Sequence, residues 1–171
     1  VQAICPRFSA IDEDPTDEDR WQRILAAWAY RFSSQVWAGW PGALLLEVKG
    51  SFSIMGQWPE LQARLRDDLT ALGFRHRIAM APTALGARVL AGVEDGLAVL
   101  NDEQLRNTLA RVPVRRACLP EDAGDRLKSM GVRNLRQVFD LPRDSLRRRF
   151  GTGLLETLDR MRGHAPEMLE C

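Results

Sequence analysis

Residues 31–48 read RFSSQVWAGWPGALLLEV, and this stretch sets the expectation for the fold. Its part 35–38 has the short β-branched and aromatic pattern of a strand. Turn-forming residues follow at Gly39, Pro41 and Gly42, and 43–48 is an apolar run, apart from Glu47, of the kind found in buried strands. The stretch therefore predicts two strands joined by a turn, within the sheet of an α/β unit.

Outward from this stretch, strand and helix patterns alternate. On the C-terminal side we expect a hairpin partner strand at 51–55, a helix at 59–72, a strand at 75–81, a helix at 82–91 and a short strand at 97–100. On the N-terminal side a helix should end near residue 32, with Trp21 and Trp28 at helical spacing and therefore in the core. This order predicts one mixed sheet with helices on one face.

Strand signals end near residue 101. Short helices are expected at 102–110, 121–130, 134–139, 143–150 and 153–161. Gly131, Pro142 and Gly151 separate them. The predicted fold class is therefore α+β, with a partial α/β domain over 1–104 followed by a small all-helical domain over 105–171.

The composition is that of a globular protein, with 45% hydrophobic and 27% charged residues. No apolar run approaches the roughly 20 residues that cross a bilayer, so we expect no membrane partner. Cys5, Cys118 and Cys171 have neither metal-binding nor disulfide-framework spacing, which favours a reducing, cytoplasmic location without zinc. There is no signal-peptide pattern, and the first residue is valine, which indicates a segment of a longer protein.

The net charge of +1 conceals a basic region in the second half of the chain. Residues 106–149 carry twelve basic and five acidic side chains, and all but one of the basic residues are arginine. Arginine makes bidentate contacts with phosphate, so this region suggests a nucleic-acid partner. A solvated, arginine-rich surface would have the same composition, and charge alone leaves both interpretations open.

One segment of the basic region, 146–153 (LRRRFGTG), has the chemistry of a phosphate site. Gly151 and Gly153 allow the backbone to approach a phosphate closely, at the start of a helix whose first N–H groups are free. The preceding arginines would add charge-assisted hydrogen bonds. The alternative is a helix-ending glycine beside an exposed arginine face. We predict a DNA-backbone site made of Arg147, Arg148, Arg149, Gly151, Thr152 and Gly153, which would carry no sequence information.

Three segments resemble the Y-family, or translesion, DNA polymerases. Residues 31–48 resemble a palm segment that reads R-Y-[ST]-x-x-[IV] and then S-x-D-E-A-Y-L-D-[VIL] in that family. Residues 79–91 (AMAPTALGARVLA) resemble G-[IV]-A-x-N-K-x-[LF]-A-K-[IV]-A, and GVRNLRQV, LRRRFG and LDRMRG within 131–163 resemble the thumb. The resemblance implies a ferredoxin-like palm portion followed by a helical thumb with helix-hairpin-helix elements.

The chain departs from the family where catalysis is concerned. The metal-binding Asp-Glu pair of the family falls on Gly42 and Ala43, which have no carboxylate. Nucleotidyl transfer needs two metal ions that such carboxylates hold. Glu47 lies an odd number of positions from Gly42, so it should face the opposite side of the strand and cannot substitute. We therefore expect no catalytic residues, no bound metal and no cofactor.

Two further departures lie outside the carboxylate pair. The two lysines of the family's second segment fall on Ala84 and Arg88, and the glycines of the first thumb hairpin are missing around Cys118, Leu119 and Pro120.

Within the family, the phrases WAYRFS and LLLEVxGS are most like the ImuB-type mutasome proteins, whose active site is degenerate. This resemblance implies a non-catalytic accessory protein of bacterial translesion synthesis and DNA repair. Its partners would be primer–template DNA, a sliding clamp, an ImuA-type protein and a DnaE-type error-prone polymerase, the proteins mostly through regions outside this chain.

Two alternatives remain open. The first is an active Y-family polymerase whose Mg²⁺ ions have unorthodox ligands, which a primer-extension assay would reveal. The second is a helix-hairpin-helix DNA-binding module with a fortuitously palm-like first half, which a strand order unlike that of a palm would favour.

Overall fold

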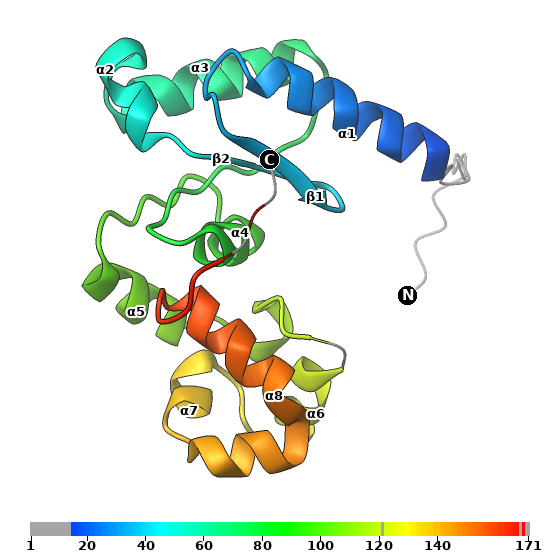
Figure 1. Cartoon of the computed structure of the whole chain (residues 1–171), viewed down its shortest axis with the longest axis vertical. Helices are drawn as coiled ribbons and strands as arrows, with labels where there is room; N and C mark the ends of the chain where they lie inside the picture. Colours follow the sequence, from blue (N-terminus) through cyan, green and yellow to red (C-terminus); the bar gives the residue numbers. More distant parts are fainter. Residues whose placement is uncertain (1–14, 121, 168, 170–171) are drawn as a thin grey trace, which may run out of the picture. The chain divides into compact units, whose positions relative to one another are not determined.

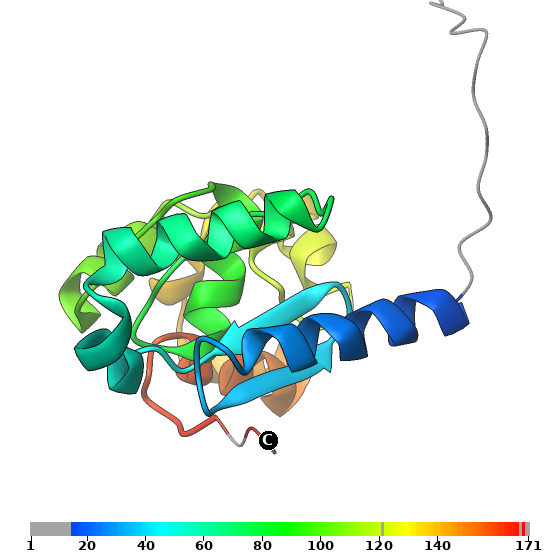
Figure 2. The same ribbon diagram turned by 90° about the horizontal axis from the view of Figure 1, so that it is seen from above.

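The protein is described by a computed structural model over residues 15–120, 122–167 and 169, with the backbone alone for 15–18. The chain divides into two compact units, with the boundary between Ser51 and Phe52. Figures 1 and 2 show the elements of each unit in two views. The predicted division at residue 104 concerned a palm-like and a thumb-like portion, and it stays a prediction.

The first unit consists of a helix and a β-hairpin. Helix α1 (Pro15–Ala29) is followed by β1 (Val36–Trp40) and β2 (Ala43–Leu46), which pair antiparallel with Val36 opposite Leu46 and Trp40 opposite Ala43. Figure 2 shows α1 running alongside the hairpin. The two strands and the turn predicted from the opening stretch are confirmed, whereas the predicted hairpin partner of the second strand was 51–55 and not 36–40.

Helix α1 buries a different face from the one its tryptophans suggested. Ala29 is fully buried, and the residues one and two turns before it, Ala26 and Gln22, are partly buried on the same side. Trp21 lies outside this stripe and is 51% exposed, whereas Trp28 is half-buried. The prediction that Trp21 belongs to the core is therefore wrong.

The second unit is helical. After the 3₁₀ turn η1 (Lys49–Ser51), its helices are α2 (Phe52–Met55), α3 (Trp58–Ala71), α4 (Ala84–Val93), α5 (Asp102–Ala110), α6 (Ala123–Ser129), α7 (Leu135–Phe139) and α8 (Arg143–Met161), with a 3₁₀ turn η2 (Val114–Arg116) before α6. Its largest fully buried side chains are mostly leucines, at Leu61, Leu90, Leu105, Leu109, Leu127, Leu135 and Leu154. The helices predicted in this part of the sequence are confirmed to within a few residues.

The predicted mixed sheet is not formed in the described part of the chain, where β1 and β2 make the one sheet. Residues 51–55 were expected to be a strand, but they form the end of η1 and helix α2. The expected strands at 75–81 and 97–100 meet only at one parallel bridge, between Met80 and Ala98. Short apolar runs fit a strand and a helix equally well, and an extended segment becomes a strand only where a neighbour supplies a ladder.

The fold class α+β is nevertheless correct, with a small two-stranded sheet and many helices. Among the described residues, no helix is both long enough and apolar enough to cross a bilayer.

Candidate nucleic-acid interface

The predicted phosphate-binding segment lies at a sharp bend inside α8. Gly151 has φ 77° and ψ −175°, which interrupts the helix between its two segments. Only glycine adopts this combination readily. A side chain added at Gly151 or Gly153 would meet no atom within 4 Å, and residues 151–153 are all exposed. The backbone of this bend, which we call the Gly151 turn (residues 150–153), is therefore open to a ligand.

An ion pair joins the two segments of α8 on either side of the bend. Nη1 and Nη2 of Arg143 donate to Oδ1 and Oδ2 of Asp159 at 2.8 and 2.7 Å. Residues sixteen positions apart in a straight helix would be about 24 Å apart, so this contact requires a sharp bend. Hydrogen bonds from the Arg143 guanidinium also hold the pKa of Asp159 below its ordinary value. The two segments of α8 are thus tied together with Gly151 at the apex.

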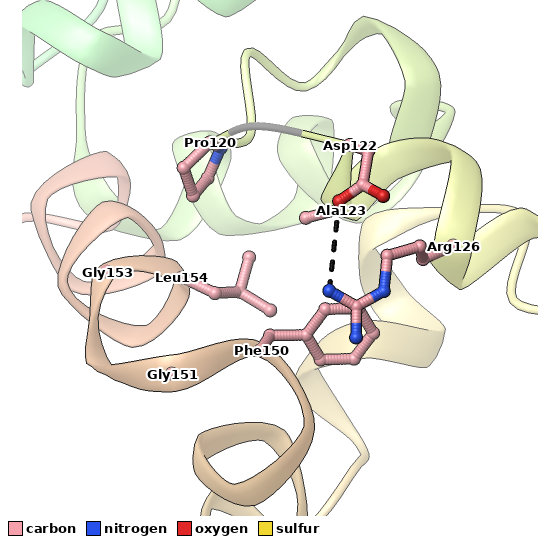
Figure 3. A pocket seen from close by; sticks show the side chains of 8 residues that line it. All are labelled: Pro120, Asp122, Ala123, Arg126, Phe150, Gly151, Gly153 and Leu154. Atoms are coloured by element: carbon pink, nitrogen blue, oxygen red, sulfur yellow. Dashed lines mark ion pairs between the residues drawn. The ribbon is translucent and has the colours of Figure 1, made fainter.

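The Gly151 turn borders a pocket of about 230 Å³ (Figure 3). One wall comes from the turn and the segment after it, and the other comes from Pro120, Asp122 and the first turn of α6. The lining residues are Pro120, Asp122, Ala123, Arg126, Phe150, Gly151, Gly153 and Leu154. Two helix-starting segments that are far apart in the sequence therefore meet at this place.

Arg126 joins the two walls of the pocket. Its Nη2 donates to the backbone carbonyl of Arg149 at 2.7 Å, and its guanidinium carbon lies 4.7 Å from the centroid of the Phe150 ring. Its Nη1 is 3.7 Å from Oδ1 of Asp122, one helical turn away (Figure 3). The sequence analysis did not identify Arg126 or Phe150, because their spacing in the chain does not indicate that they meet.

The three predicted arginines do not converge on one point. All three are exposed, but successive residues of a helix point about 100° apart. Arg147 lies 4.0 Å from Oδ1 of Asp144, and Nε of Arg148 donates to the carbonyl of Asp144 at 3.3 Å. Nη1 of Arg149 lies 3.8 Å from the sulfur of Met130. The arginines therefore spread positive charge around the end of the first segment of α8.

The positions aligned with the polymerase carboxylates lie at the tip of the β-hairpin in the first unit. Gly42 has φ 62° in the turn, and Ala43 is the first residue of β2. The side-chain amide of Gln22 donates to the carbonyls of Ala38 and Trp40 at 2.6 and 2.7 Å. A neutral donor thus faces main-chain oxygens beside these positions, and the described ranges contain no group of three or more His, Cys, Asp or Glu residues that could hold a metal ion.

Glu47, the carboxylate nearest to Gly42 and Ala43 in the sequence, accepts hydrogen bonds from its own loop. Its Oε1 accepts from the backbone N–H of Lys49 at 2.9 Å and its Oε2 from that of Gly50 at 3.3 Å. Its carbonyl accepts from the hydroxyl of the buried Ser33 at 2.6 Å. Both carboxylate oxygens of Glu47 therefore face its own loop, and the expectation that Glu47 does not replace the missing carboxylates stays a prediction.

The segment that lacks the family's two lysines forms the start of α4. The Thr83 side chain caps the helix by accepting from the N–H of Gly86. The N–H of Leu85 donates to Oε2 of Glu167 at 2.9 Å, and burial raises the pKa of that carboxyl. A carboxylate of the chain itself therefore occupies this helix end.

Known proteins are similar to this chain in sequence and in fold. No family model matches the chain. It is 30% identical over 167 residues to Protein ImuB from each of two strains of Caulobacter vibrioides, a match that covers 98% of this chain. The chain spans 36% of the length of those relatives. The resemblance to ImuB-type proteins that the sequence indicated is therefore confirmed.

A solved structure gives an independent comparison of the fold. The crystal structure of DinB from Sulfolobus solfataricus matches 92% of this chain and 48% of its own with a TM-score of 0.69, at 15% sequence identity. The chain thus has the fold of the corresponding part of DinB.

Proposed function

We propose that this chain is part of a non-catalytic, polymerase-like accessory protein of translesion DNA synthesis. In this proposal the Gly151 turn binds the DNA backbone, and the protein as a whole serves as a scaffold for an error-prone polymerase. The similarity to ImuB and the DinB-like fold support a role of this class.

The observation that carries the non-catalytic part is the pair Gly42 and Ala43. Two-metal catalysis needs carboxylates that neutralise and position the cations. A glycine and an alanine supply neither charge nor ligand, and Gln22 turns its amide donors toward the neighbouring carbonyls. The N–H groups of Lys49 and Gly50 hold the Glu47 carboxylate against its own loop, so in this proposal it does not serve as the missing ligand.

The DNA-binding part follows from the Gly151 turn. The first N–H groups of a helix have no partner within that helix, and the second segment of α8 begins just after Gly151. Two glycines keep side chains away from this end, so a phosphate oxygen can approach the backbone. Arg147, Arg148 and Arg149 surround the turn with positive charge. Such a site binds any DNA sequence and weakens as salt is added.

We propose that the protein partners bind mostly outside this chain. A sliding clamp, an ImuA-type protein and a DnaE-type polymerase would then contact the remainder of a protein as long as the ImuB relatives, of which this chain spans 36%. The chain described here would supply the DNA contact.

Primer extension tests the catalytic part of the proposal. The full-length protein should add no nucleotide to a primer–template in the presence of Mg²⁺ or Mn²⁺, while an active Y-family polymerase in the same buffer extends the primer. Template-directed incorporation that survives purification to homogeneity would overturn the proposal and favour an active polymerase with unorthodox metal ligands.

A further inference from the structure

We propose, on the basis of the DNA-binding function above, that Arg126 is a positioning residue for the Gly151 turn. It acts by holding residues 149 and 150 in place, and its own positive charge contributes little to phosphate binding.

Arg126 first supplies a donor to the carbonyl of Arg149. In an uninterrupted helix this carbonyl would accept from the N–H four residues later, but the bend at Gly151 breaks that register. Nη2 of Arg126 donates to this oxygen at 2.7 Å, which is a short, charge-assisted hydrogen bond. Arg126 therefore stabilises the end of the first α8 segment next to the turn.

Arg126 also contacts the ring of Phe150. The guanidinium lies over this ring at 4.7 Å from its centroid, within the range of a cation–π contact. Phe150 directly precedes Gly151 and is only partly exposed. Holding the ring also holds the backbone from which the glycine turn departs.

The positive charge of Arg126 is partly offset by its neighbours. The guanidinium faces the carboxylate of Asp122, the carbonyl of Arg149 and the face of Phe150 (Figure 3). Because these contacts direct the guanidinium toward the protein, it is not free to reorient toward a phosphate. The side chain of Lys128, two residues later in α6, is exposed and makes no hydrogen bond or ion pair with the described residues.

The shape of the guanidinium makes these contacts specific to arginine. The planar group can donate to a carbonyl from its edge while its face covers an aromatic ring. A lysine ammonium has the same charge, but it is a compact point charge that cannot make both contacts in this geometry. Replacing Arg126 by lysine keeps the positive charge but removes the contacts, so it distinguishes a positioning role from a direct electrostatic contribution to phosphate binding.

The experiment compares Arg126→Lys and Arg126→Gln with the control Lys128→Gln. Affinity for a primer–template duplex is measured by fluorescence anisotropy over a salt series. Amide hydrogen exchange at Leu155, Glu156 and Thr157, the first N–H groups after the turn that can bond within the second segment of α8, is measured by NMR in the free proteins. Both Arg126 variants should bind about tenfold more weakly, with the salt slope of the wild type and faster exchange at these three positions. Lys128→Gln should leave exchange unchanged.

The proposal is overturned if Arg126→Lys keeps wild-type affinity and exchange, or if Arg126→Gln lowers the salt slope by about one while exchange stays unchanged. Should an Arg126 variant fail to fold, as judged by circular dichroism, Phe150→Leu provides the second test. It keeps the charge at position 126, so weaker binding with faster exchange supports positioning, and unchanged behaviour contradicts it. If the wild type binds no DNA, the proposed function fails, and the exchange rates alone still decide the role of Arg126.

Discussion

Gly42 and Gly151 both have a positive φ, and they bear on opposite halves of the proposed function. Gly42 stands where a carboxylate would be needed for catalysis, in a turn that any small residue with left-handed backbone could form. Gly151 also needs an extended ψ of −175°, which makes it difficult to replace. In the proposed function, one glycine thus stands in place of a catalytic carboxylate and the other belongs to the DNA-binding turn.

The two glycines of the Gly151 turn give a matched pair of substitutions. Gly151→Ala should lower the free energy of unfolding by about 1–3 kcal/mol, because alanine is strained at φ 77° and ψ −175°. Gly153→Ala has no such penalty, because position 153 lies in the second helical segment of α8. It should leave the free energy of unfolding unchanged or raise it by up to about 1 kcal/mol. Urea denaturation measures both. Equal effects at the two positions would contradict the assigned conformation of Gly151.

Asp95 provides a pH prediction. Hydrogen bonds from Arg66, and then from the N–H of Ile78, lower the pKa of Asp95 to about 2. Because the folded pKa is depressed, the contribution to stability is present above the ordinary Asp pKa of about 4 and is lost as pH falls toward 2.

Asp95→Asn should therefore melt below the wild type at pH 5 to 7, with a difference that shrinks toward pH 2. The difference should be small, because both partners are more than one-third exposed and solvent screens the pair. Thermal melts of the two proteins at several pH values test this, and a gap that widens on acidification would contradict the assigned direction.

At the scale of elements, the helices of the second unit were largely predictable from local sequence. The side chains of Asn101 and Asn134 accept from the N–H groups of Gln104 and Gln137 and cap α5 and α7, and the helices predicted there began at residues 102 and 134. The strands expected at 51–55 and 75–81, in contrast, did not form. A strand depends on a neighbouring chain segment, which no local pattern specifies.

The packing of α4 against α8 is a feature that the sequence did not indicate. The Thr83 hydroxyl accepts from the N–H of Gly86 at 3.1 Å and donates to the carbonyl of Met161 at 2.9 Å. A Cβ on Gly86 would lie 2.4 Å from that hydroxyl oxygen and 3.0 Å from Leu105. Gly86 therefore lets one hydroxyl join the start of α4 to the end of α8.

This geometry predicts coupled substitutions. Gly86→Ala should cost about 1–3 kcal/mol because it displaces the Thr83 hydroxyl, and Thr83→Val should cost about 1–2 kcal/mol because it removes the cap and the hydrogen bond. The double variant should be destabilised by less than the sum, since both changes remove the same interactions. A double-mutant cycle by urea denaturation measures the coupling, and strict additivity would argue against it.

At the scale of the whole molecule, the candidate segment was visible in the sequence, but the residues that pack beside it and form the pocket were not. The segment 146–153 was recognisable because glycines and arginines carry their chemistry locally. Arg126 and Phe150 meet only through tertiary packing, so neither composition nor spacing could indicate that they touch. The missing carboxylates could be noticed only by resemblance to a family, because an absent residue leaves no pattern of its own.

The salt dependence of DNA binding tests the proposed DNA contact most directly, measured as the dissociation constant for a primer–template duplex between low and physiological salt. We expect binding to weaken steeply with salt and to be equal for two unrelated sequences. Replacing Arg147, Arg148 and Arg149 together by alanine should flatten the logarithmic slope by roughly one to two, because each phosphate that the protein neutralises contributes about 0.9 to that slope. No binding by the wild-type protein, or a slope that the triple substitution leaves unchanged, would contradict a DNA-binding role for the Gly151 turn.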